Sequence, residues 1–236
     1  MSPTRQRCWW SSLSKNSNRA VTCLIGTALL VACRSGSTPA ADTGSATSAT
    51  TIQTIVTSFD SATLPGSHAD DTLEALLITS VPDGFRQVDD SEADTGPSDL
   101  EKAAKDDGGG ADSTATLSDA GFVSGYQRAW QTDDQRGVII LFLYEFSTQY
   151  GAESYGERLI ALFDSEPTLE AVPFDVDGVP NATGRSMTSL EADARLSSSV
   201  VFYKNGFLVQ VVVISPTDTE GQTLVQQLAI DQFSRL

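Results

Sequence analysis

Histidine and cysteine are almost missing from the part of this chain that can fold, which excludes several kinds of catalytic and metal site. The single histidine is His68, and the three cysteines are Cys8, Cys23 and Cys33. A Ser-His-Asp or Cys-His catalytic arrangement therefore cannot form within residues 71–236. Neither can a disulfide bond or a cysteine-based metal site, so packing alone must stabilise a domain there.

Basic residues are also few. The chain has 15 lysines and arginines against 31 aspartates and glutamates, which gives a net charge of -16. So acidic a surface repels the phosphates of nucleic acids and of anionic lipid headgroups, and we expect no nucleic-acid partner. The simplest role of this charge is to keep the protein in solution.

Motifs of the common enzyme classes are missing as well. The sequence has no HExxH zinc motif, no glycine-rich phosphate loop and no Walker-type lysine, and no SxxK follows Cys33. Residues 175–178 (DVDG) begin like a calcium-binding loop, but the twelfth residue is Ser186, where that loop needs a glutamate, so we predict a turn. We expect no metal, no cofactor and no enzymatic activity; an envelope hydrolase using a serine or a carboxylate pair is the alternative.

The N-terminal region has the composition of a secretory signal. Residues 1–19 contain four basic residues and no acidic ones, and residues 20–32 are almost entirely apolar. A positively charged segment before an apolar segment of this length is typical of a signal peptide. An uncleaved transmembrane anchor, the first alternative, would need about 20 apolar residues.

The apolar segment ends on Leu30-Val31-Ala32-Cys33, which resembles the lipobox of bacterial lipoproteins. The resemblance implies cleavage between Ala32 and Cys33, attachment of diacylglycerol to the Cys33 sulfur, and acylation, for example with palmitate, of the new N-terminus. It also implies a protein anchored by lipid on the extracytoplasmic face of the cell membrane. Ordinary secretory cleavage further along is the other alternative, and it leaves Cys33 without a role.

Composition divides the rest of the chain into a tether and a domain. Residues 33–70 are rich in Ser and Thr with Pro and Gly, which predicts a flexible tether that reaches about 30 Å. Residues 71–236 form the predicted domain. Within it, residues 89–119 hold ten acidic residues and three consecutive glycines, and we predict a disordered insert there, with a capping box at 98–101 for one short helix. Clustered carboxylates suit Ca²⁺, but no spacing in the insert matches a calcium loop.

Hydrophobic periodicity predicts the elements of the domain. Asn205-Gly206 is typical of a type I′ hairpin turn, and residues 138–146 (VIILFLYEF) are apolar on both faces. Strands are predicted at 85–88, 122–130, 138–146, 169–174, 182–189, 200–203 and 207–214. Helices are predicted shortly after residue 71, from a cap at Ser147 to about 163, and from a capping box at Thr217 to 236.

Each long amphipathic helix follows a hairpin and needs a sheet on which to bury its apolar stripe. The economical arrangement is an α+β fold of two layers, an antiparallel sheet of five to seven strands with both main helices on one face. Residues 81–85 (VPDGF) and 125–130 (GYQRAW), with this order of elements, resemble the secreted α+β domains of actinobacterial lipoproteins and the extracellular sensor domains of some bacterial kinases. The resemblance implies an extracytoplasmic binding or sensor domain.

Four residues on the predicted strands are candidates for a ligand groove: Tyr126, Arg128, Trp130 and Tyr144. Aromatic residues and arginine are enriched at binding surfaces, but strand aromatics are also expected to pack in cores, and core packing is the interpretation that we favour. We predict a membrane-anchored, non-catalytic binding or sensor domain whose partner is an envelope protein or other envelope component. The alternative is a carrier of a lipid or other apolar molecule, which needs an apolar cavity of roughly several hundred Å³ between sheet and helices.

Overall fold

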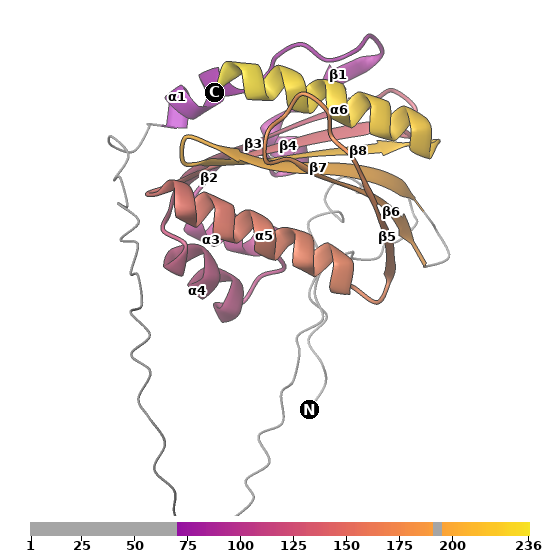
Figure 1. The fold of residues 1–236 in the computed structure, drawn as a ribbon. Helices are drawn as coiled ribbons and strands as arrows, with labels where there is room; N and C mark the ends of the chain where they lie inside the picture. Colours follow the sequence, from indigo (N-terminus) through magenta and orange to yellow (C-terminus); the bar gives the residue numbers. More distant parts are fainter. Residues whose placement is uncertain (1–69, 191–194) are drawn as a thin grey trace, which may run out of the picture. The chain divides into compact units, whose positions relative to one another are not determined.

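The computed structural model describes residues 70–190 and 195–236 (Figure 1). The predicted signal peptide, Cys33 and the predicted tether up to residue 69 lie outside these described residues. Within the described ranges, no helix combines the length and the apolar character that crossing a membrane requires.

The strands of the described chain form one antiparallel sheet of eight strands, in the order β1-β3-β4-β8-β7-β6-β5, with β2 also paired to β3. They are β1 (Phe85–Gln87), β2 (Gly96–Ser98), β3 (Phe122–Thr132), β4 (Val138–Phe146), β5 (Leu169–Phe174), β6 (Thr183–Ser189), β7 (Leu196–Lys204) and β8 (Phe207–Ser215). The predicted strands at 138–146 and 169–174 are confirmed. So is the hairpin at Asn205-Gly206, where both residues have the positive φ (55° and 82°) that a type I′ turn requires.

Two long helices follow the two hairpins. The helices are α1 (Asp70–Leu76), α2 (Asp90–Ala93), α3 (Leu100–Asp106), α4 (Ala111–Asp119), α5 (Gln149–Ser165) and α6 (Asp218–Arg235). Thr217 caps α6 as predicted, because its hydroxyl oxygen accepts from the amide of Glu220 (3.3 Å). The cap of α5 is Thr148 and not Ser147: Thr148 Oγ1 accepts from the amide of Gly151 (3.0 Å).

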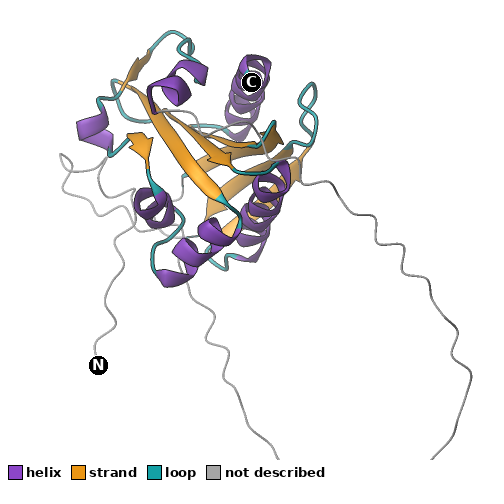
Figure 2. Cartoon of the chain, turned by 90° about the vertical axis from the view of Figure 1, so that its left-hand side faces the viewer, coloured by secondary structure: helices purple, strands orange, loops and turns teal. Residues whose placement is uncertain are grey.

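The α5 and α6 helices lie on opposite faces of the sheet, and in Figures 1 and 2 the strands run between them. Alternate residues of β8 show this arrangement: Val209 and Val211 belong to the core cluster of Leu228 on α6, whereas Leu208 belongs to the cluster of Leu159 on α5. The α+β class and the antiparallel sheet are confirmed, but the predicted placement of both helices on one face is wrong. Because β4 and β8 are apolar on both faces, each face needs its own helical cover.

The acidic segment 89–119 is ordered, contrary to the prediction of a disordered insert. It forms α2, β2, α3 and α4, of which α3 and α4 lie beside α5 (Figure 1). Its buried apolar residues are Ala93, Ala103, Ala104 and Leu117. The Lys102 ammonium donates to the carbonyl oxygens of Thr95 (2.6 Å) and Pro97 (3.2 Å), which ties α3 to β2. Small alanines and paired charges order this segment, and neither produces a strong hydrophobic pattern.

Hydrogen bonds connect the C-terminal end of α1 to α6. Gln232 is fully buried; its side chain accepts from the amide of Ile78 (2.9 Å) and donates to the carbonyl oxygen of Leu76 (3.0 Å). Arg235 donates to the same oxygen of Leu76 and to that of Ala75 (3.3 and 3.0 Å). These bonds satisfy carbonyl groups at the end of α1 that the helix itself leaves without partners.

Candidate functional site

The four residues predicted to line a groove do not meet. Tyr126, Arg128 and Trp130 alternate along β3 and lie on the α6 face, whereas Tyr144 on β4 lies in the core cluster on the α5 face. All four are buried, with 2 to 6% of each residue exposed. This burial agrees with core packing, the favoured interpretation, and the four candidate residues do not form one groove.

Arg128 has a structural role at the end of α1. Its Nη2 donates to Glu74 Oε1 (2.6 Å) and its guanidinium lies over the ring of Tyr126, 5.6 Å from the centroid. Its Nη1 lies 3.5 Å from the carbonyl oxygen of Ile78. Arg128 thus connects β3 to the α1 segment. Because its guanidinium is buried in these contacts, it is unavailable to a ligand.

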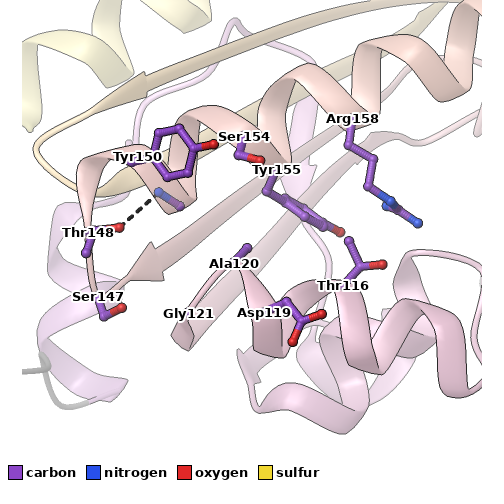
Figure 3. A pocket seen from close by; sticks show the side chains of 11 residues that line it. Thr116, Asp119, Ala120, Gly121, Ser147, Thr148, Tyr150, Ser154, Tyr155 and Arg158 are labelled. Atoms are coloured by element: carbon purple, nitrogen blue, oxygen red, sulfur yellow. Dashed lines mark hydrogen bonds between the residues drawn. The ribbon is translucent and has the colours of Figure 1, made fainter. Parts of the chain in front are cut away.

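A different pocket opens between α4 and α5 (Figure 3). Its volume is about 440 Å³, within the usual range for small-molecule sites. Five residues of α5 line it, and α4 contributes Thr116 and Asp119 from the opposite wall. The α5 residues are Tyr150, Gly151, Ser154, Tyr155 and Arg158, and the connecting segments add Ala120, Gly121, Ser147 and Thr148.

An ion pair holds the side chain of Arg158, which lines this pocket. Arg158 Nη1 donates to both carboxylate oxygens of Asp107 (3.0 and 2.9 Å), and its guanidinium lies over the ring of Tyr155, 5.7 Å from the centroid. The Asp107 side chain is 3% exposed and the Arg158 side chain 30%, so the pair extends from the interior to the pocket. Asp107 directly follows α3, and Arg158 lies on α5. The ion pair therefore also connects the acidic segment 89–119 to α5.

Burial is the main cause of the shifted pKa values of Asp107 and Tyr155. It raises the pKa of Asp107, while the Arg158 guanidinium and the Tyr155 hydroxyl, which hydrogen-bonds the carboxylate, oppose that rise. Burial, and then the nearby Asp107 charge, raise the pKa of Tyr155 well above its ordinary value. Tyr155 therefore keeps its proton at neutral pH and remains a hydrogen-bond donor.

Asp106 lies next to Asp107 without a partner. Both of its carboxylate oxygens are buried, and neither has a hydrogen bond within the described residues. Burial raises its pKa to about 7; the Asp94 carboxylate adds to the rise, and Lys102 and Lys105 oppose it. Burial raises the pKa of Tyr144 well above its ordinary value, and the nearby Asp106 carboxylate adds to that rise. A carboxyl group that titrates near neutrality makes the stability of the fold depend on pH.

Several hydroxyl groups of the pocket are available to a ligand. Ser147 and Ser154 make no side-chain hydrogen bond to any residue in 70–190 or 195–236, and Asp119 forms no ion pair there. Tyr150 is 73% exposed, which makes it the most exposed large hydrophobic residue of the described chain. The rim thus offers an aromatic ring, and the walls offer both donors and acceptors.

A second pocket lies at the end of the β5–β6 hairpin. It has a volume of about 610 Å³ and includes Asp175, Asp177 and Arg185. Arg185 is held by Asp164, which accepts from its Nε and Nη2 (2.7 and 2.8 Å). Among the described residues, no group of three or more His, Cys, Asp or Glu side chains is placed to hold a metal ion.

Sequence reasoning missed the residues of the α4–α5 pocket. Tyr155 is buried with the apolar side of its helix, as helical periodicity would place it, but its hydroxyl hydrogen-bonds to Asp107. One signal was present: Arg158 is the only basic residue of α5, and it follows Tyr155 by three positions, on the same side of the helix.

Comparisons with known proteins give a fold likeness and little more. No protein-family model and no curated protein matches the sequence. Among solved structures, the chain is similar to the extracellular domain of PknH from Mycobacterium tuberculosis, with 13% sequence identity and a TM-score of 0.47 over 72% of this chain and 98% of that one. A resemblance at this level does not carry over to function.

Proposed function

We propose that this chain is an extracytoplasmic lipoprotein, anchored in the cell membrane by lipid on Cys33, whose domain binds a ligand without transforming it. The observation that supports the anchor is the sequence Leu30-Val31-Ala32-Cys33 directly after a short apolar segment. Two or three acyl chains hold a protein on a membrane stably, whereas one holds it only marginally.

The α4–α5 pocket supports the binding role. It has the volume of a ligand site, an exposed aromatic residue at its rim, and serine hydroxyls that no described side chain engages. Catalysis by a serine would require a neighbouring base. Among the described residues, neither the Ser147 nor the Ser154 hydroxyl is hydrogen-bonded to a side chain that could act as a base, so the arrangement suits recognition.

The anchor is tested by replacing one atom. Cys33→Ser should remove metabolic labelling with an alkyne-tagged fatty acid and release the protein from washed membranes, because a hydroxyl cannot take the place of the thiolate. Cys23→Ser, ten positions earlier in the predicted signal, is the matched control and should leave labelling unchanged. Retention and labelling of the Cys33→Ser protein would show that the anchor is something other than lipid on this residue.

The binding role is tested in intact cells with a photo-crosslinking amino acid. Placed at position 150, on the rim of the pocket, it should capture an envelope component; placed at position 190, where Leu190 is 62% exposed and outside the pocket, it should not. Equal capture at both positions, or none at position 150, would contradict binding at this pocket. Capture of membrane lipid alone would favour the apolar carrier instead.

A further inference from the structure

The one positively charged residue that lines the α4–α5 pocket is already paired. Arg158 is its one cation, and the Asp107 carboxylate already pairs with that guanidinium at 2.9 Å. Asp119 adds a negative charge on the opposite wall. An anionic ligand would gain little from an arginine already paired, and it would also meet the negative field of a chain with net charge -16. A cationic ligand could pair only with Asp119, and an ion pair to so exposed a carboxylate contributes little affinity. The pocket therefore suits an uncharged ligand.

The polar groups that line the pocket include both hydrogen-bond donors and hydrogen-bond acceptors. Serine and threonine hydroxyls can each donate and accept, a carboxylate accepts, and a guanidinium donates in a planar fork. Ser154 and Tyr155 lie one position apart on α5, with Thr116 across the opening (Figure 3). A purely apolar ligand would remove water from these groups without replacing its hydrogen bonds, which is unfavourable for each group left without a partner.

The exposed ring of Tyr150 adds a third feature. An aromatic face carries partial negative charge, so it attracts the weakly positive C–H groups on the flat side of a sugar ring. Tyrosine also gives a large contact area while losing little conformational entropy, which is why it is common in binding sites that recognise varied ligands. Because Tyr150 is 73% exposed, a ligand that covers its ring would remove a large apolar surface from water.

We infer that the α4–α5 pocket binds an uncharged polyhydroxylated ligand, a sugar ring or a short glycan, through Tyr150 on one side and the hydroxyl, carboxylate and guanidinium groups on the other. The volume of about 440 Å³ equals that of some fifteen waters at about 30 Å³ each, which is room for one or two sugar rings. This inference rests on the proposed binding function and names the chemical class of its ligand.

The test is saturation-transfer NMR on the full lipidated chain in detergent micelles. The probes are the methyl glycosides of common hexoses, pentoses and N-acetylhexosamines at about 5 mM, above the millimolar Kd usual for single sugars. Inorganic phosphate, glycine and decanoate represent anions, zwitterions and apolar acids. Tyr150→Ala removes the exposed ring, and Leu190→Ala removes an exposed apolar side chain outside the pocket as the matched control.

We expect at least one neutral glycoside to bind, with a Kd raised at least about tenfold by Tyr150→Ala and unchanged within about twofold by Leu190→Ala. Absence of binding by every glycoside, or equal effects of the two substitutions, would overturn the inference. Binding of phosphate, glycine or decanoate that Tyr150→Ala abolishes would refute the sugar class and leave the binding function standing. Silence of all probes together with no capture at position 150 in cells would refute both.

Discussion

The buried carboxyl of Asp106 makes a quantitative prediction about stability. In the unfolded chain this group ionises near its ordinary pKa of 3.8, and in the fold burial moves that pKa to about 7. Between these two pH values the folded state binds more protons than the unfolded state, so the contribution of Asp106 to the free energy of unfolding falls as pH rises. The loss is complete above about pH 8. Asp106→Asn removes this titration.

The magnitude follows from the pKa difference. Each pKa unit corresponds to about 1.4 kcal/mol, so roughly three units give about 4 kcal/mol at most. The pKa of about 7 already includes the opposing charges of Lys102 and Lys105, but the side chain is not completely enclosed and water screens it, so we expect about 2–4 kcal/mol. An asparagine has its own cost of burial, but that cost is the same at every pH and cancels when two pH values are compared.

The assay is urea denaturation of the wild type and of Asp106→Asn at pH 4.5 and pH 8.5. The free energy of unfolding of the variant, relative to the wild type, should be higher at pH 8.5 than at pH 4.5 by about 2–4 kcal/mol. Glu101→Gln, an exposed acidic position on the same helix, is the control and should show almost no such difference. A difference below about 0.5 kcal/mol for Asp106→Asn would refute the claim that this carboxylate is buried without a partner.

Three further predictions concern the pocket wall and the junction of the terminal helices. Arg158→Gln leaves the Asp107 carboxylate buried without its cation and should lower the free energy of unfolding by about 2–4 kcal/mol in urea denaturation. Adding Asp107→Asn should recover at least half of that loss; no recovery would argue against the ion pair. Gly151→Ala would place a methyl group 1.9 Å from the Ala120 carbonyl oxygen and should cost about 3 kcal/mol; a thermal midpoint equal to that of the wild type would contradict this close approach. Gln232→Leu removes two hydrogen bonds to the α1 segment and should cost about 2 kcal/mol while speeding exchange of the Ile78 amide, and unchanged exchange of that amide would count against the junction.

The elements that sequence predicts well are those set by local chemistry. The β7–β8 hairpin follows from Asn205-Gly206, and α6 begins at Thr217 because a threonine there accepts from a nearby amide. The face that a helix covers is a different kind of property. It depends on how β4 and β8 meet, and the pairing of Leu141 with Val211 joins residues 70 positions apart. The apolar character of β4 on both faces did contain the relevant information, since a strand covered on one side only would alternate.

The site was less predictable than the fold. Arg158 and Asp107 are separated by 51 positions, and Asp107 lies in a segment whose acidic composition favours disorder. Its order comes from alanine packing and from this ion pair, neither of which a hydrophobic pattern reveals. The four candidate residues do not form one groove because Tyr126 and Tyr144 are on neighbouring strands but on opposite faces, and the alternation that decides this depends on the register of β3 and β4.

The fastening of α1 to α6 has a mechanical consequence. If the chain is anchored through Cys33 as proposed, drag on the domain pulls first on α1, whose last turn is held by Gln232 and Arg235. That load passes into the longest helix of the described chain and spreads over the sheet beneath it. The α5 helix, which lines the pocket, lies on the other face of the sheet (Figure 1), so the strands separate the pocket from the helix that takes up the load. Force applied through the tether therefore reaches α6 and the sheet before it reaches the helices that form the pocket.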